Sequence, residues 1–456
     1  MKSQRALWAN RKPRTELSLI GGRASVGLCV LLMLWNAGEL QADGLAETIQ
    51  QLNQRHPRVQ ERALQLAASL DEASYRGSVY PDPMLGISFR NLPYKRNLPI
   101  ILDQEPMTGI EYMLTQPIPF PGRLSAEAEI ADLGARASRL RLALEKNTVT
   151  REFLLALIEF RNASESLALA ENYGDQSRVV ADTARARYSV GRGNLAGVTR
   201  ANLDQDRYNE RIERLQGLRD SWQRRLEYYF PENETPPTDS LLALSREVDG
   251  YLAELWREMQ AAELNVATES LLVALGRVET ERTGRDESLA RYDYLPDFQV
   301  FASYMRRDRL RGDRTTGEDF YSFGLTMRVP LWSALSNSDQ VESRTHLRRA
   351  EEVGVADMTS REQSEFAAAR ERFQTASERV RLFRESLIPR ARLTRDSLRT
   401  TYETGESEIF DLLQVWNELY MLESECLAIE LERNEALITM LAIVNRILPA
   451  GEGHEP

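Results

Sequence analysis

The sequence predicts an α+β membrane protein in which four short β-strands are continued by very long α-helices. Two observations indicate this class. Stretches of alternating apolar and polar residues end at proline-rich corners, and helix-forming tracts of unusual length follow each corner. A third observation sets the organisation, because the whole pattern occurs twice along the 456 residues.

The repeat is visible as landmarks that recur at a nearly constant separation. Pro117 corresponds to Pro330, 213 residues later, and Tyr188 corresponds to Tyr402, 214 residues later. We therefore interpret the chain as an internal tandem duplication. The expected domains are a first repeat at 43–245 and a second repeat at 246–456.

The segment before the first repeat has the features of a signal peptide. Basic residues precede an apolar run from Ala24 to Trp35, and these 12 residues are too few to span a bilayer. We predict a signal peptide at 1–42, cleaved after Ala42, with Ala37 as the competing site. A buried helix in a cytosolic protein is the alternative interpretation of this run.

Charge and cysteine content restrict the mature chain further. Cleavage leaves Cys426 as the single cysteine, so no disulfide within the chain is expected. The net charge of −11 argues against nucleic acid as a partner. No stretch beyond the signal peptide offers the roughly 18 apolar residues of a membrane helix, so a membrane-embedded part must consist of strands.

Each repeat contains a predicted β-hairpin, at about 84–117 and at about 297–330. In the last strand an apolar face alternates with a polar face, which is typical of transmembrane barrel strands. A half-buried sheet in a soluble protein uses the same period and is the alternative. The two faces of that strand are Tyr321, Phe323, Leu325, Met327 and Val329, and Ser322, Gly324, Thr326 and Arg328.

Prolines mark the end of both hairpins. Pro117, Pro119 and Pro121 follow the first hairpin, and Pro330 follows the second. Because proline cannot donate a backbone hydrogen bond, the strands should end at these residues and the backbone should bend. Each corner is therefore expected to convert the sheet into a long helix.

A long helical hairpin is expected after each corner, at 122–229 and at 337–446. The outgoing arm of the first hairpin would reach about 100 Å, at a rise of about 1.5 Å per residue. Apolar residues at alternating three- and four-residue steps indicate coiled-coil packing. Interruptions of the outgoing arms are expected at Gly174 and Pro389.

The hairpins should reverse at Gly191 and Gly405, because a glycine in the left-handed conformation readily ends a helix. Asn194 and Ser407 are the expected N-caps of the returning helices. Other predicted segments are helices at about 45–79 and about 248–293, a proline-containing equatorial linker at 231–245, and a C-terminal tail after residue 446.

Four strands cannot close a barrel, and open sheet edges are not tolerated in lipid. Three copies would supply 12 strands, an even number within the range known for bacterial barrels. We therefore expect a homotrimer with a twelve-stranded transmembrane β-barrel, four strands from each chain. A long α-helical coiled-coil tunnel would continue this barrel.

Three sequence features together carry a family resemblance. They are the duplicated plan, the run QPIPFPGRLS from Gln116, and the two Tyr-x-x-Gly turns at Tyr188 and Tyr402. With these features the chain resembles the TolC-type outer-membrane efflux proteins over nearly all of its mature length. The run at Gln116 is most similar to the heavy-metal and cation efflux branch.

The resemblance implies an outer-membrane channel of a tripartite efflux system, with a helical tunnel in the periplasm. Such a channel exports small substrates, here with heavy-metal cations as candidate cargo. The implied partners are two further copies of the chain, a periplasmic adaptor protein, an inner-membrane pump of the RND type and outer-membrane lipid. The family's tip turns form the closed entrance and contact the adaptor, which implies this role for Tyr188, Gly191, Tyr402 and Gly405.

Asp411 lies six residues after Gly405, where members of the family carry an entrance carboxylate. Three Asp411 side chains, one from each copy, would then ring the entrance and favour cations. The alternative is that Asp411 complements the N-terminal dipole of its own helix. The family's further acidic position is Gln414 here, and the first tip carries Gly197 at the place of Asp411.

Catalytic patterns are missing from the sequence. His56, His346 and His454 lack the spacing of metal ligands, and no nucleophile–base pair is evident. We therefore do not expect an enzyme, a cofactor or a metal site. Two other functions remain open, a conduit for type I protein secretion and a soluble periplasmic coiled-coil scaffold.

Overall fold

The computed structural model describes residues 44–92, 108–191, 193–231, 236–261, 264–307, 317–404 and 408–448. Several sequence-based predictions lie outside these residues. They are the signal peptide at 1–42 with its cleavage site, the turn residues Gly405 and Ser407, and the C-terminal tail beyond Leu448.

The described strands form one antiparallel sheet in the order β1-β2-β3-β4. Its register places Tyr304 opposite Tyr112 on one side and opposite Tyr321 on the other. The β2–β3 pairing therefore joins the two predicted hairpins edge to edge. The strands are β1 Met84–Arg90, β2 Gly109–Ile118, β3 Asp297–Arg307 and β4 Phe320–Arg328.

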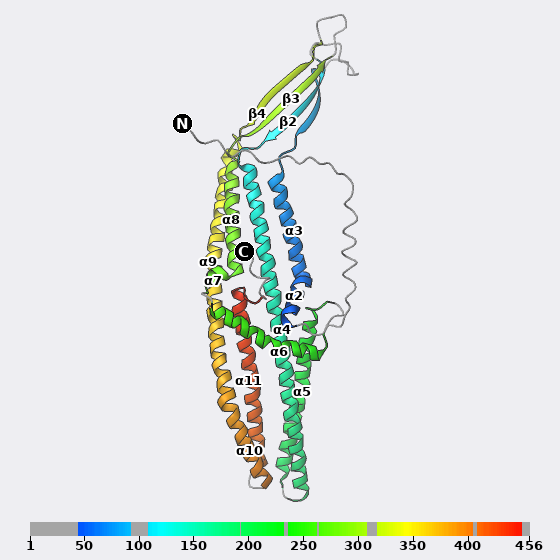
Figure 1. Cartoon of the computed structure of the whole chain (residues 1–456), viewed down its shortest axis with the longest axis vertical. Helices are drawn as coiled ribbons and strands as arrows, with labels where there is room; N and C mark the ends of the chain where they lie inside the picture. The colour runs from blue at the N-terminus through cyan, green and yellow to red at the C-terminus, as the bar shows by residue number, and fades with distance from the viewer. Residues whose placement is uncertain are drawn as a thin grey trace, which may run out of the picture. The chain divides into compact units, whose positions relative to one another are not determined.

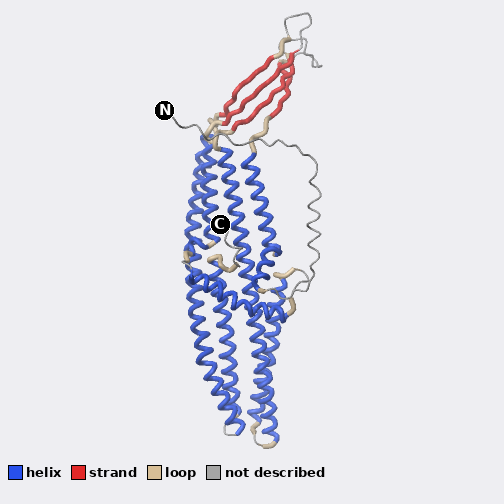
Figure 2. The backbone as a smooth tube through the Cα atoms, viewed as in Figure 1, coloured by secondary structure: helices blue, strands red, loops and turns tan. Residues whose placement is uncertain are grey.

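Long helices continue the sheet within the unit formed by residues 44–456, and Figures 1 and 2 show the strands at one end of these helices. The central helix, α4, packs against α3, α5, α8 and α11. The described helices are α2 Leu45–Arg55, α3 Pro57–Ser78, α4 Arg123–Ser189, α5 Leu195–Glu227, α6 Thr238–Ala261, α7 Val266–Glu269, α8 Leu271–Tyr292, α9 Ser333–Leu382, α10 Ile388–Thr404 and α11 Ile409–Ile443.

The two expected interruptions of the long arms have different outcomes. Helix α4 runs for 67 residues straight through Gly174, so the expected interruption there is wrong. Gly174 instead lets α5 approach closely, because a Cβ at this position would lie 3.1 Å from Cδ1 of Ile212. The interruption near Pro389 is confirmed as a π-helical turn, Phe383–Leu387, between α9 and α10. The wider turn accommodates the proline ring, which would collide with a carbonyl one turn earlier.

The predicted helix at 45–79 is two helices that meet at His56. Pro57 takes the first position of α3, and the residue before a proline is disfavoured in helical conformation. His56 caps α3, its Nδ1 accepting a hydrogen bond from the backbone N–H of Arg58 at 3.3 Å. Burial, followed by the charge of Arg58, lowers the pKa of His56 and favours the neutral acceptor form.

The predicted helix at 248–293 is also divided, into α6, α7 and α8. Helix α6 begins at Thr238, so the second half of the stretch 231–245 expected as a linker is helical. The prolines of that stretch precede the helix and do not interrupt it. Buried apolar residues then follow at helical spacing: Leu241, Leu244, Val248, Leu252, Leu255 and Met259.

Helix α6 crosses the other helices, as Figure 1 shows, and a polar junction fixes it there. The buried Arg161 of α4 donates to the carbonyl of Ser245 at 3.0 Å and forms an ion pair with Asp249 at 3.0 Å. Asn434 of α11 donates to the same carboxylate at 3.0 Å. The largest buried apolar cluster surrounds this crossing, so α4, α6 and α11 form the core of the unit.

The corner after β2 is built from the predicted prolines. Pro117 pairs with Gln299 of β3. β1 begins at Met84, opposite Thr115, so no residue of β1 lies beside Pro117 to accept a hydrogen bond from the N–H that proline lacks. The strand therefore continues to Ile118, one residue past the predicted end. Pro119 and Pro121 lie in the turn that leads into α4.

Gly122 and its neighbour connect the sheet to the helices. Gly122 has φ of +95°, and a Cβ there would lie 2.6 Å from the hydroxyl of Tyr292 in α8. The guanidinium of Arg123 lies 3.2 Å from Asp293 and 3.8 Å from Asp297, at the end of α8 and the start of β3. At the second corner, Pro330 follows the end of β4, and α9 begins three residues later.

Replacing Gly122 with Ala should destabilise the protein, because it combines a strained φ with a collision against Tyr292. We expect the free energy of unfolding to fall by about 1–3 kcal/mol. Gly217→Ala is the control, since no atom lies within 4 Å of a Cβ in the middle of α5. That control should be stabilised by about 0.5–1 kcal/mol. Denaturant unfolding checks both, and equal effects of the two substitutions would contradict this account of the corner.

Candidate functional site

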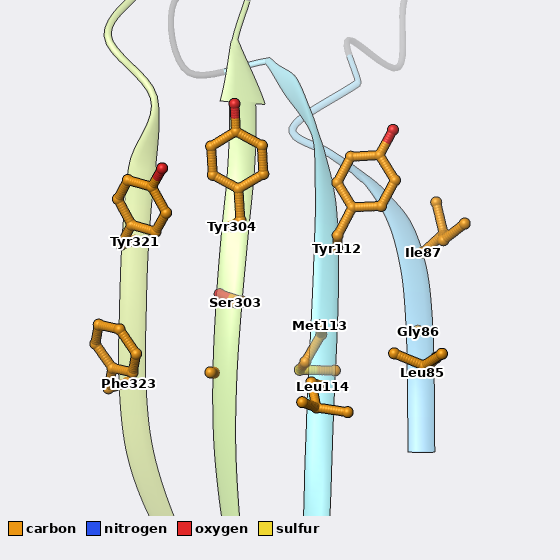
Figure 3. Close-up of a pocket in the computed structure, with 11 residues that line it drawn as sticks. Leu85, Gly86, Ile87, Tyr112, Met113, Leu114, Ser303, Tyr304, Tyr321 and Phe323 are labelled. Carbon is orange, nitrogen blue, oxygen red and sulfur yellow. The ribbon is translucent and has the colours of Figure 1, made fainter. Parts of the chain in front are cut away.

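One face of the sheet is apolar and open. Leu85 is 85 % exposed, Tyr321 71 % and Phe323 79 %. Figure 3 shows Tyr112, Tyr304 and Tyr321 side by side across three strands, and the Tyr304 and Tyr321 rings lie 5.1 Å apart. Together these side chains line a shallow hollow of about 370 Å³. An apolar surface of this kind normally contacts a membrane or another protein.

The opposite face of the sheet carries polar groups together with Met113, Phe301 and Met305. Glu111 of β2 is buried there, accepts a hydrogen bond from Ser88 at 3.2 Å and forms an ion pair with Arg90. Ser88 and Arg90 both belong to β1, so the Glu111 carboxylate connects β1 to β2. In β4 the apolar residues Tyr321 and Phe323 lie on the first face and Ser322 lies on the second, as the alternation of that strand predicted.

The first helical tip reverses as expected. Gly191 has φ of +74°, and a side chain there would be strained. Asn194 caps α5, its Oδ1 accepting from the backbone N–H of Gly197 at 2.7 Å. In the second tip the residue before α11 is Glu408, whose side chain makes no capping bond. The predicted cap Ser407 lies outside the described residues.

The two tips contact each other through a residue that the sequence analysis missed. Arg187 of α4 donates to the backbone carbonyl of Tyr402 at 2.9 Å, and its guanidinium lies 4.1 Å from the centre of the Tyr402 ring. Tyr402 also packs in an apolar cluster with Leu412 and Leu413 and is only 7 % exposed, whereas Tyr188 is 47 % exposed. Gly197 lies against the second tip, because a Cβ there would be 3.0 Å from Ile409.

Asp411 lies in the first turn of α11 and is exposed. Leu412 and Leu413 beside it are buried and fix the orientation of this turn. No described residue forms an ion pair with Asp411 within 4.0 Å. The geometry therefore leaves its carboxylate open to solvent, and both interpretations of Asp411 stay predictions.

The described part of the chain also has features that bear on metal sites, reactive thiols and membrane-spanning helices. No group of three or more His, Cys, Asp or Glu side chains there is placed to hold a metal ion. Cys426 is buried, and its thiol donates to Glu430 at 3.3 Å. Across the described ranges, every helix is too short or too polar to cross a lipid bilayer.

Replacing Arg187 with Ala should loosen the contact between the tips. The variant loses a charge-assisted hydrogen bond and a cation–π contact, together worth about 1–3 kcal/mol. We expect a broader distance distribution between spin labels at Val190 and Glu408, measured by pulsed electron resonance. Arg178→Ala is the control. Arg178 lies on the same helix, and its exposed side chain forms an ion pair with the exposed Asp175, one turn away, at 3.5 Å. Identical distributions for both variants would show that Arg187 does not join the tips.

No protein-family model matches the chain, and no curated protein matches it in sequence. Solved structures do match it. The outer-membrane channel OprN has a TM-score of 0.69 at 13% identity, with 89% of this chain and 91% of that chain covered. The outer membrane protein VceC of Vibrio cholerae has a TM-score of 0.69 at 13% identity, with 88% of this chain and 96% of that chain covered. The open state of the Neisseria gonorrhoeae MtrE outer membrane channel has a TM-score of 0.67 at 14% identity, with 88% of each chain covered. The single chain therefore has the fold of these outer-membrane proteins, a four-stranded sheet continued by long helices, as the TolC-type resemblance implied for one chain.

Proposed function

We propose that this protein is the outer-membrane channel of a tripartite efflux system and exports small substrates from the cell. One observation carries the proposal: a sheet with an exposed apolar face continues directly into helices of up to 67 residues. The likeness in fold to outer-membrane channels supports it. A sheet that enters lipid and helices that extend away from it suit a conduit across the outer membrane and periplasm.

The proposed assembly is a homotrimer. The described sheet has two edge strands, β1 and β4, and lipid does not tolerate open edges. Joining β4 of one copy to β1 of the next, three times, would close a twelve-stranded barrel. The helices below would then enclose the tunnel, and the two halves of each chain would descend from one duplicated unit.

The dimensions of the sheet suit a bilayer. Strand β4 has nine residues, about 30 Å at 3.3 Å per residue, and a tilt of about 40° reduces this to a height of about 23 Å. The apolar band of bacterial barrels is about 25 Å tall. Two exposed aromatic residues lie where the sheet meets the helices. Trp332, after the end of β4, is 84 % exposed, and Tyr80, before the start of β1, is 51 % exposed. We assign these two aromatic residues to the periplasmic membrane interface.

The tips are the proposed entrance and adaptor contact. Tyr188 and Gly191 are exposed and suit direct contact with a periplasmic adaptor. Tyr402 is covered by Arg187, so we propose that it acts indirectly, by holding the second tip to the first. Gly405 belongs to the same proposed entrance and lies outside the described residues. An inner-membrane pump of the RND type would supply the cargo, with heavy-metal cations as the proposed class.

A conduit for type I protein secretion is the second candidate, because an exported protein would use the same tunnel. The exposed apolar sheet face is the observation that favours either channel over a soluble periplasmic scaffold. Genes for a pump or for a secreted protein beside the coding gene would separate the two channels.

A lysine on the apolar face should block membrane assembly, whereas a lysine on the adjacent polar face should not. Phe323→Lys places a charge in lipid at a cost of about 2–4 kcal/mol, and Ser322→Lys points into the proposed lumen. We expect Ser322→Lys and the unmodified protein to reach the outer membrane as particles of three chains. Phe323→Lys should give fewer such particles.

Membrane fractionation and light scattering in detergent measure these outcomes. A one-chain particle for the unmodified protein would contradict the shared barrel. Equal assembly of the two lysine variants would contradict the membrane role of the apolar face.

Replacing Asp411 with Asn should reduce the cation selectivity of single-channel conductance in planar bilayers, because it removes three charges from the proposed entrance ring. Asp411→Glu is the control and should retain the selectivity. If Asp411→Asn lowers thermal stability and leaves selectivity unchanged, the helix-dipole interpretation is correct instead.

A further inference from the structure

A small pocket lies among three helices on the tip side of the α6 crossing. Ser177 of α4, Asp204 and Arg207 of α5, and Trp416 of α11 are among its lining residues. Its volume is about 10 Å³. The pocket therefore lies where the first helical hairpin, α4 and α5, packs against the second.

Two polar atoms at this pocket have no partner among the described residues. They are the hydroxyl oxygen of Ser177 and the indole nitrogen of Trp416, and both atoms are buried. Ser177 is 1 % exposed and Trp416 is 8 % exposed. Buried polar groups in folded proteins are nearly always hydrogen-bonded, because an unsatisfied group keeps its full desolvation penalty. Two such groups lining one pocket point to a ligand that hydrogen-bonds to both.

The size and charge of the pocket select that ligand. A volume of about 10 Å³ holds about one water molecule and nothing larger. Arg207 and Arg211 are also among the lining residues, and their positive charge disfavours a cation. The carboxylate of Asp204, buried and 3.5 Å from both Arg200 and Arg207, disfavours an anion. A neutral molecule that both donates and accepts hydrogen bonds fits the remaining requirements.

We propose that one water molecule is bound in this pocket and bridges Ser177 of the first hairpin to Trp416 of the second. The indole N–H of Trp416 would donate to the water oxygen. The water would donate one hydrogen to the Ser177 hydroxyl oxygen, and its second hydrogen would face the Asp204 carboxylate. The bridge connects the two hairpins independently of the Arg187 contact, and it does not rest on the proposed function.

A structure of the purified full chain at about 2 Å resolution tests the proposal directly. We expect a density peak within hydrogen-bonding distance of both the Ser177 hydroxyl and the Trp416 indole nitrogen. The same peak should be absent or displaced in Trp416→Phe. No peak in a map that shows other buried waters would overturn the proposal.

Thermal unfolding supplies a second test with a matched control. Ser177→Ala should lower the unfolding temperature by about 1–3 °C relative to Ser164→Ala, since it removes one partner of the bound water. Ser164 lies on the same helix, and its hydroxyl bonds only locally, to the carbonyl of Phe160 at 2.8 Å. Both variants gain the same helix propensity, and Ser164→Ala leaves no bound water without a partner. A dry pocket predicts the opposite sign, because Ser177→Ala would remove an unsatisfied hydroxyl. The density decides if the two tests disagree.

Discussion

The two unpaired edges of the sheet constrain the rest of this structure. In the described residues β1 and β4 each have one neighbouring strand, and the apolar face of the sheet is open. Each unsatisfied backbone group on such an edge costs several kcal/mol in lipid. The sheet is therefore suited to a bilayer only when further strands continue it. The proposed trimer follows from this requirement, and the helices must then be arranged to suit a closed ring of strands.

The corner between β2 and α4 fixes the position of the helices relative to the sheet. Gly122 has a backbone conformation that favours glycine, and the Tyr292 hydroxyl occupies the space of its missing side chain. Arg123 then joins the start of α4 to Asp293 and Asp297, on either side of the junction between α8 and β3. The entry into α4 and the exit from α8 are thus fixed against each other. Farther along α4, Arg161 bonds to α6, and Asn434 of α11 bonds to Asp249 of α6, so α4 is held both at the corner and at this crossing.

Local patterns in the sequence predicted the elements well, and long-range packing explains what they missed. Alternation located the four strands, and Gly191 and Asn194 end and start helices as expected. A local pattern predicts an interruption at Gly174, because glycine is a poor helix former. The reason for the glycine is its close contact with Ile212, which lies on another helix and does not enter a local pattern. The break at His56 could have been found, since Pro57 suits the first position of a new helix. The Arg187–Tyr402 contact joins residues 215 positions apart, and no periodicity reveals it.

That contact also shows why the two tips differ although their turns share a sequence pattern. The residue that corresponds to Arg187 in the second repeat, 214 positions later, is Thr401, so the second hairpin has no arginine to repeat the contact. Arg187 covers Tyr402, while the corresponding Tyr188 stays open. In the proposed channel, an adaptor could therefore bind Tyr188 directly but would reach Tyr402 only by displacing Arg187. Displacement would remove one of the contacts that hold the second tip, which carries Asp411, so adaptor binding would weaken the attachment of that tip.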